Sequence, residues 1–383
     1  MRRFDAALIV FASLIGTACS TVEKLNPFGS SGPVVKPNEL VSLQPTADVK
    51  SVWQASVGSA GSYAFSPAIM GESIYAGARD GTLTRFDGGR QVWRVSAGQV
   101  ISGGVGSDGK LVVVGTPKGE VLAFDAANGR ELWKARVSSE VLSAPAVADG
   151  LVVVRSGAAR IFGFDAADGK RRWVYQRSTP ALALRTSVGV MLAGKFTLAG
   201  FPGGKLVAIA NNNGASVWEV TVALPKGSTE LERVADVTSI PAVSGSTICA
   251  AAFQGRVACF ESSSGNTLWS RDMSSSVGVD MDNRYVYITD DKGAVHALDR
   301  TSGASVWKQD KLALRSVSRP LAIGNLVAVA DYQGYVHFLR REDGAFAARQ
   351  ATDGSAVRAD PQTFGNGLLI QTANGNLHAI ESR

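Results

Sequence analysis

The sequence predicts an all-β fold, an eight-bladed β-propeller built from four-stranded antiparallel blades. The composition supports this, because 42 glycines, 13 prolines and 45% hydrophobic residues among 383 favour many short strands joined by tight turns. One unit also recurs from residue 51 onward: a turn glycine, an alternating strand, a second turn and a strand with a tryptophan. A single sheet of this kind leaves a face exposed, whereas sheets packed around an axis cover one another.

The N-terminal residues predict an export signal. Two arginines precede an apolar stretch at 6–15, which is too short to anchor the chain across a membrane. Cys19 follows small residues directly, which resembles the lipobox of bacterial lipoproteins, although Gly16 stands where an aliphatic residue is usual. We expect a signal peptide at 1–18 and a lipidated Cys19; an ordinary cleaved signal is the alternative.

Residues 19–50 predict a lipid-anchored flexible tether. Four prolines lie among Ser, Gly and Asn, a composition that does not support a packed core. Ser20 after the cysteine is similar to lipoproteins that are sorted to the outer membrane, and dual acylation gives stable anchoring. We therefore expect the protein at the periplasmic face of the outer membrane, held there by lipid.

Eight copies of the repeat divide residues 51–383. Six end in a tryptophan, and two weaker copies begin at Gly334 and Gly375. The chain finishes on the strand 377–380 without room for an outer strand, so we expect the strand around Trp53 to complete the eighth blade. All seven tryptophans share one phase of the repeat, which favours packing between blades over ligand stacking. They are residues 53, 93, 133, 173, 218, 269 and 307.

The three histidines, His296, His337 and His378, each lie three residues after a turn glycine. One position on three successive blades separates them by about 10 Å, whereas a metal needs ligand atoms about 2 Å away. We therefore expect these histidines to pack rather than to bind a metal. No catalytic triad, nucleophile elbow or Cys-x-x-Cys motif is present, so neither catalysis nor a cofactor is predicted.

The charge does not indicate a nucleic-acid partner. The formal net charge is +6, but the 39 basic residues are dispersed among 33 acidic ones and never form a run of four. Basic proteins that bind nucleic acid concentrate this charge on a stripe or patch.

Cys249 and Cys259 flank a hairpin turn around Gln254. A three-residue loop centred on Gln254 would place the two cysteines opposite each other and allow a structural disulfide. A two-residue loop would offset them by one position and point them to opposite faces. Both possibilities stay open from the sequence.

Two connections between blades are longer than the others. From tryptophan to the next inner strand, most blades need 12 or 13 residues, but the connections at 174–188 and 219–240 bring this to about 16 and 23. Both join an outer strand to the next inner strand, so they emerge on one rim as neighbours. Insertions in repeat proteins gather on the binding face, and we expect a partner here.

The content of the two connections suits recognition. The first offers Leu182, Leu184 and Arg185, apolar anchors beside an arginine, as interface hot spots do. In the second, Asp236 could orient Arg185 or accept a basic group of the partner. Thr229 and Glu232 have the spacing of a capping box, which predicts a short helical turn. The alternative is that the leucines only seat the first loop on the propeller.

These features carry a resemblance. Residues 51–383 look like the PQQ-type repeat propellers, and the lipobox together with the motifs at 180–185 and 228–236 resembles the BamB family of outer-membrane assembly lipoproteins. The resemblance implies a non-catalytic scaffold that docks a POTRA domain of BamA through Leu182, Leu184, Arg185 and Asp236. It also implies assistance to unfolded outer-membrane proteins. Thr238 departs from the family, which often has an acidic residue there.

Two other functions share the predicted fold. A quinoprotein dehydrogenase that uses pyrroloquinoline quinone would have eight blades, but it would need a calcium site rich in carboxylates and a disulfide between adjacent cysteines. Neither is evident in this sequence. A propeller lipoprotein of another envelope complex is the other alternative, because a fold does not fix its partner.

Overall fold

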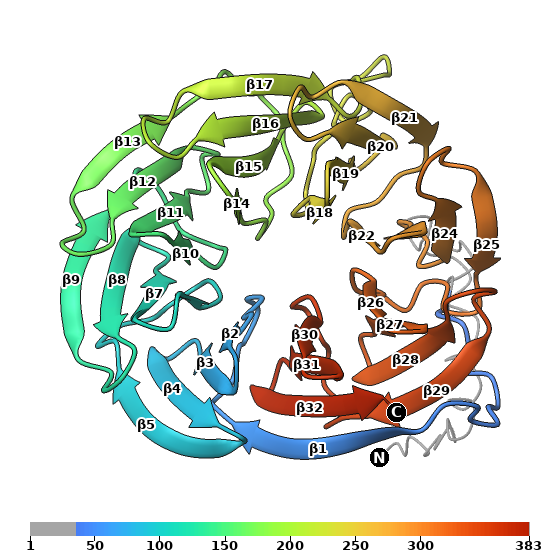
Figure 1. Ribbon diagram of the computed structural model, residues 1–383, viewed down its shortest axis with the longest axis horizontal. Helices are drawn as coiled ribbons and strands as arrows, with labels where there is room; N and C mark the ends of the chain where they lie inside the picture. The colour runs from blue at the N-terminus through green and yellow to red at the C-terminus, as the bar shows by residue number, and fades with distance from the viewer. Residues whose placement is uncertain (1–35, 383) are drawn as a thin grey trace, which may run out of the picture. The chain divides into compact units, whose positions relative to one another are not determined.

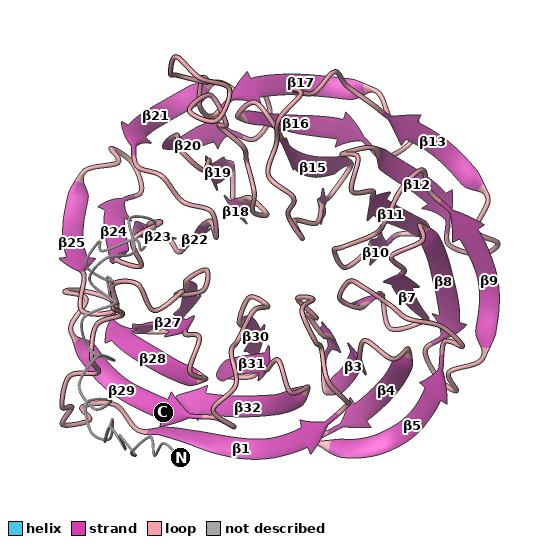
Figure 2. Ribbon diagram, turned by 180° about the vertical axis from the view of Figure 1, so that it is seen from behind, coloured by secondary structure: helices cyan, strands magenta, loops and turns pink. Residues whose placement is uncertain are grey.

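The computed structural model describes residues 36–382, and these form a ring of eight four-stranded sheets (Figure 1). The predicted eight-bladed β-propeller is confirmed. The described residues consist of strands and loops (Figure 2), so they contain no helix that could cross a membrane. The predicted signal peptide 1–18, Cys19 and the first part of the predicted tether lie outside the described residues.

Seven blades take their four strands consecutively from the chain, from the innermost strand outward. Blades 1 to 4 comprise β2 (Ala68–Met70), β3 (Ser73–Gly77), β4 (Thr82–Asp87) and β5 (Arg90–Ser96); β6 (Gly106–Ser107), β7 (Leu111–Gly115), β8 (Glu120–Asp125) and β9 (Glu131–Arg136); β10 (Ala146–Ala148), β11 (Leu151–Arg155), β12 (Ile161–Asp165) and β13 (Arg171–Tyr175); β14 (Met191–Ala193), β15 (Phe196–Phe201), β16 (Lys205–Ala210) and β17 (Ser216–Thr221). Blades 5 to 7 comprise β18 (Ala242–Ser244), β19 (Thr247–Ala251), β20 (Arg256–Glu261) and β21 (Thr267–Asp272); β22 (Val279–Met281), β23 (Tyr285–Thr289), β24 (Val295–Asp299) and β25 (Ser305–Gln309); β26 (Leu321–Ile323), β27 (Leu326–Ala330), β28 (Tyr335–Arg340) and β29 (Phe346–Ala351).

The eighth blade joins both ends of the chain. Strands β30 (Gln362–Phe364), β31 (Gly367–Gln371) and β32 (Asn376–Ser382) come from the C-terminus, and β1 (Val49–Ser56) pairs with β32 as the outer strand. Trp53 lies opposite Ala379 in this pairing. The predicted closure by the N-terminal strand is therefore confirmed, since β1 supplies the outer strand of the eighth blade and closes the ring (Figure 1).

The tryptophans join each blade to the next, as predicted. The indole nitrogen of Trp133 donates a hydrogen bond to the Ala166 carbonyl of the following blade at 2.9 Å, and five other tryptophans make the equivalent bond. The ring lies against the turn glycine of that blade, Gly169 in this case, where a Cβ atom would come within 2.5 Å of the indole. Glycine at positive φ thus closes the turn and admits the ring.

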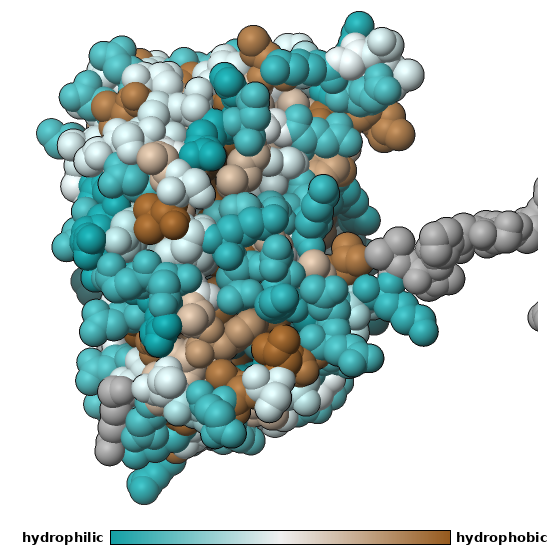
Figure 3. Space-filling model, turned by 90° about the vertical axis from the view of Figure 1, so that its right-hand side faces the viewer, coloured by the Kyte–Doolittle hydropathy of each residue, from teal (hydrophilic) through white to brown (hydrophobic). Residues whose placement is uncertain are grey.

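A β-bulge precedes the tryptophan position in every outer strand. In blade 2, Ala123 pairs with Trp133 and Phe124 pairs with Glu131, so Leu132 has no partner. The same shift occurs in the other seven blades. Bulges twist an edge strand and interrupt its ladder, which disfavours the addition of another strand. Six bulge residues are exposed and apolar, yet on the wall in Figure 3 apolar residues are interspersed with polar ones.

The predicted extent of the tether, to residue 50, is wrong at its C-terminal end. Residues 37–48, here called the N-terminal strap, belong to the same compact unit as the propeller. Asn38 N donates to the Ala313 carbonyl at 3.0 Å, and Thr46 N and Ala47 N donate to the Ala347 carbonyl at 2.8 and 3.2 Å. The strap is therefore bound along blade 7.

Blade 7 has a structural reason to bind the strap. It is the blade without a tryptophan, because Ala348 stands opposite Phe338 at that position. Ala47 and Val49 pack instead on the core cluster that blades 7 and 8 share. Apolar contact from the N-terminal segment thus covers the one blade interface that lacks an indole.

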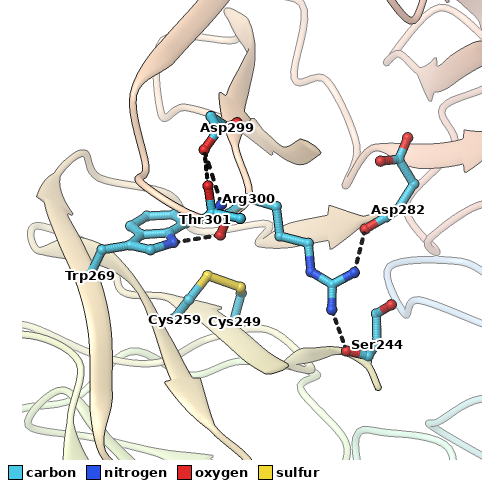
Figure 4. Close-up of a disulfide and its surroundings, with 8 residues drawn as sticks. All are labelled: Ser244, Cys249, Cys259, Trp269, Asp282, Asp299, Arg300 and Thr301. Atoms are coloured by element: carbon cyan, nitrogen blue, oxygen red, sulfur yellow. Dashed lines mark hydrogen bonds between the residues drawn. A yellow bond between two sulfur atoms is a disulfide. The ribbon is translucent and has the colours of Figure 1, made fainter. Parts of the chain in front are cut away.

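Cys249 and Cys259 form a disulfide inside blade 5. They are directly opposite in β19 and β20, and the loop Phe253–Gly255 between them has three residues, closed by Ala252 N and the Arg256 carbonyl. The disulfide lies beside Trp269 and Arg300, whose guanidinium donates to the Ser244 carbonyl at 2.6 Å (Figure 4). The disulfide thus links two strands of blade 5, and the neighbouring Arg300 hydrogen bond joins blades 5 and 6.

Candidate partner-binding site

The two long connections meet on one rim of the propeller. One leads from β13 to β14 and the other from β17 to β18, so both start at an outer strand and return to the axis (Figure 1). They are joined directly, because the backbone N–H of Leu184 donates to Oδ2 of Asp236 at 2.7 Å. The expected neighbourhood of the two loops is present.

Asp236 links three segments of the chain. Besides Leu184, its carboxylate accepts a hydrogen bond from Gly203 N at 3.0 Å, which belongs to a turn of blade 4. The side chain is buried, with 2% of the residue exposed. Hydrogen bonds from two backbone N–H groups satisfy the buried charge and fix both loops in one arrangement.

The expectation that Asp236 orients Arg185 is wrong. The Arg185 side chain is 73% exposed, and its Nε lies 3.4 Å from Oε1 of Glu140, in the connection between blades 2 and 3. Asp236 is also too deeply buried to accept a basic group of a partner in this arrangement. Its contact with the partner-binding surface is made through the backbone of Leu184.

The surface of the two loops is apolar at four leucines. Leu182 and Leu184 are 43% and 38% exposed, and the second loop adds Leu224 and Leu231 at 65% and 69%. Leu224 was not among the predicted residues, because a lone leucine after a strand carries no sequence signal. Exposed leucines beside a charged rim are typical of a protein-binding surface.

The capping box at 229–232 is confirmed. Thr229 Oγ1 accepts a bond from Glu232 N at 3.2 Å, and Glu232 Oε2 accepts bonds from Ser228 N and Thr229 N at 2.7 and 3.1 Å. Hydrogen bonds from these backbone groups lower the pKa of Glu232. The segment makes one turn, closed by Arg233 N and the Thr229 carbonyl, and this turn presents Leu231 outward.

Thr238 is buried and its hydroxyl is hydrogen-bonded within the propeller. Its hydroxyl donates to the Ser276 carbonyl at 2.8 Å, and the residue is 8% exposed. It therefore links the second loop to the connection that enters blade 6. A carboxylate at this position would place a charge next to that carbonyl, so the departure from the family is compatible with the local packing.

Two of the three histidines form hydrogen bonds with an aspartate of their own blade. His296 Nε2 lies 2.9 Å from Asp290 Oδ2, and His337 Nε2 lies 3.0 Å from Asp331 Oδ2. In blade 8, Thr372 stands at the aspartate position, and the buried Nε2 of His378 has no partner in the structure. Among residues 36–382, no group of three or more metal-ligating side chains could hold an ion.

The cavity on the propeller axis does not fit a quinone cofactor with calcium. Its volume is about 620 Å³, and residues of the inner strands β2, β6, β10, β14 and β30 line it together with Arg319, Arg358 and Asp360. Asp280, beside this cavity, is already paired with Arg319 and accepts a bond from Ala322 N. The disulfide lies within blade 5 rather than on the axis.

The blades, the tryptophan anchors and the two rim loops define a propeller of PQQ-type repeats with exposed leucines on one rim. The family described as "Outer membrane protein assembly factor BamB" matches residues 79–309. The chain is 43% identical to the BamB of Bordetella pertussis over 100% of this chain and 98% of that protein. It is 38% identical to the BamB of Pseudomonas aeruginosa over 99% and 98% of the two chains. The chain belongs to the BamB family.

Solved structures agree with this assignment. The crystal structure of BamB from Moraxella catarrhalis has a TM-score of 0.81 at 28% identity, covering 87% of this chain and all of that one. A quinohemoprotein alcohol dehydrogenase from Comamonas testosteroni has a TM-score of 0.69 at 13% identity, covering 87% and 76%. At that identity the second likeness shows the fold alone. The relatives carry the name of an outer-membrane protein assembly factor, and the BamB crystal structure has the same propeller fold.

Proposed function

We propose that the protein is a lipid-anchored scaffold of the outer-membrane β-barrel assembly machinery. In this role it docks a POTRA domain of BamA and assists the folding and insertion of barrel proteins. The names of its relatives support the assembly role. The observation that carries the docking is the joined pair of rim loops, which presents Leu182 and Leu184 on a fixed backbone.

The chemistry of this surface suits a protein partner. Leu182 and Leu184 are about 40% exposed in the free protein. Covering them with a partner would stabilise the complex by about 25 cal/mol per Å² of apolar surface removed from water. Arg185 extends beside them and can form charge-assisted hydrogen bonds. Asp236 acts as a positioning residue, because it holds the Leu184 backbone from below.

The lipid anchor belongs to the same proposal. Cys19 would carry the acyl chains and place the propeller at the periplasmic face of the outer membrane. The chain from Cys19 to the start of the strap would then be the tether, shorter than residues 19–50 because the strap is part of the propeller.

Co-purification with BamA tests the docking. The Leu182→Ala and Arg185→Ala variants of the full chain are expected to recover less BamA from solubilised outer membranes, since each removes a side chain from the surface. Leu268→Ala is the matched control, because Leu268 is 52% exposed on the outer wall of blade 5. Equal recovery of BamA by all three variants would exclude these loops as the docking surface.

A further inference from the structure

A small cavity lies directly beneath the first rim loop. Its volume is about 220 Å³, and its walls come from Thr179, Leu184 and Thr186 of the loop and from Pro202 of blade 4. On the blade 3 side, the exposed residues Gly157 and Ala158 border it, so the cavity reaches the surface. It therefore adjoins the proposed docking surface.

Arg155 lines this cavity as a buried cation. It is the last residue of β11 and is 9% exposed. Nη1 donates to the Gly200 carbonyl, and the guanidinium carbon lies 5.3 Å from the centre of the Phe201 ring. Burial lowers the pKa of Arg155 to about 10, so the group stays charged at neutral pH.

The hydrogen bonding of this guanidinium is incomplete. The group has five N–H donors, and the described residues give it one hydrogen bond. Among residues 36–382, no carboxylate oxygen lies within 4.0 Å of Arg155, whereas 17 such contacts join other basic and acidic side chains. A buried charge normally has a paired group that satisfies it, because leaving it unpaired costs free energy.

The neighbouring carboxylates are already committed. The charge of Asp236 raises the pKa of Arg155, but its carboxylate already accepts hydrogen bonds from Leu184 N and Gly203 N. Glu140 pairs with Arg185, and Glu219 pairs with Arg177. A carboxylate that completes Arg155 would thus come from outside the described chain.

Arg177 provides an internal comparison. Its guanidinium carbon lies 5.6 Å from the centre of the same Phe201 ring, but Arg177 does not line the cavity. Nη2 of Arg177 donates to Glu219 Oε1 at 3.1 Å. Two arginines therefore lie near one aromatic ring, and only the one in the cavity lacks a carboxylate.

We propose that the Arg155 cavity receives an aspartate or glutamate side chain of the docked partner, which forms a charge-assisted pair with the guanidinium. The proposal rests on the docking function given above and adds the chemistry of one contact. An acidic side chain fits because a carboxylate accepts two parallel hydrogen bonds from a guanidinium. The opening beside Leu184 would place this contact within the footprint of the partner.

Affinity measurements with purified full-length BamA as the probe test this contact. Arg155→Met keeps an unbranched side chain and removes the charged guanidinium; we expect at least about tenfold weaker binding, the effect of a lost charge-assisted bond. Arg172→Met is the matched control, since Arg172 pairs with Asp165 on the outer strand of blade 3 and lies outside both rim loops. We expect at most about a threefold change, because a partly exposed ion pair contributes little. Thermal melting of each variant reports whether the propeller is folded.

The outcomes separate the cavity from the docking surface. If Arg155→Met binds normally while Leu182→Ala binds weakly, the cavity proposal fails and the docking stands. If both bind normally, both proposals fail. Substituting the aspartates and glutamates of BamA one at a time, with the unmodified chain as partner, needs no Arg155 variant. We expect one of these substitutions to weaken binding about tenfold. If none of them weakens binding, the proposal is overturned.

Discussion

Asp236 Oδ2 accepts a hydrogen bond from the backbone N–H of Leu184 at 2.7 Å, across 52 positions of the sequence. This bond joins the two longest connections of the propeller and fixes the segment that exposes Leu182 and Leu184. The other oxygen binds Gly203 N, so the loop pair is also attached to blade 4. The proposed docking surface is therefore preorganised by one buried carboxylate.

Asp236→Asn should loosen the first rim loop without unfolding the propeller. The amide can accept at one oxygen only, so one buried backbone N–H loses its partner at a cost of about 1–3 kcal/mol. Hydrogen exchange of residues 179–186 should accelerate, and affinity for BamA should fall. Asp168→Asn, at an exposed turn of blade 3, is the control. Unchanged exchange in the loop would show that the carboxylate does not hold it.

Gly303→Ala should destabilise the propeller more than Gly324→Ala. Both glycines have positive φ, +70° and +55°, so both variants carry the backbone cost. Only at Gly303 would the new Cβ lie 2.5 Å from the Trp269 ring, whereas nothing lies within 4 Å at Gly324. We expect an additional loss of about 1–3 kcal/mol from overpacking. Equal midpoints in denaturant unfolding would contradict the proposed role of the blade interface.

Arg349→Met should release the N-terminal strap. Nη1 and Nη2 donate to the Val41 carbonyl at 3.1 and 3.2 Å, and Nε donates to His337 Nδ1 at 3.2 Å. Their loss should make the strap sensitive to limited proteolysis. Arg340→Met removes a guanidinium from the same blade, where it pairs with the exposed Asp343, and should leave the strap protected. If the strap resists proteolysis in both variants, other contacts are sufficient to hold it on the propeller and the prediction is wrong.

The contribution of His337 and His378 to the stability of the propeller should fall as the pH is lowered from 7.5 to 5. Burial lowers the pKa of His337 and of His378 below the usual 6.5. In this range the unfolded chain binds protons that the folded chain does not, so unfolding becomes easier at lower pH. Lowered aspartate pKa values act only at more acidic pH, near and below 3.8. Urea unfolding should therefore show a flatter profile for the double variant His337→Gln, His378→Gln.

The sequence predicted the parts of the fold that repeat. Eight copies of one unit gave the blades, and the position of Trp53 gave the closure, because each is a local pattern in the chain. The loops could be singled out by their excess length and predicted as neighbours because both connect an outer strand to the next inner strand. The Cys249–Cys259 pairing depended on one loop length, which the sequence left open.

The binding of the strap to the propeller and the burial of Asp236 could not be predicted from a local pattern. The strap binds through its backbone N–H and C=O groups to Ala313 and Arg349, about 300 positions away, and such bonds leave no side-chain pattern. The burial of Asp236 depends on how two loops fold over it. Arg155 likewise has no sequence signal, since its significance comes from the carboxylate that it lacks.

Photo-crosslinking from the rim loop tests the central claim most directly. A photoreactive residue at Leu184 should form an adduct with BamA in intact cells, because Leu184 lies on the proposed docking surface. The same residue at Asn212, an exposed position on the opposite rim of blade 4, should not. An adduct with BamA from position 212 and none from position 184 would contradict docking through the two rim loops.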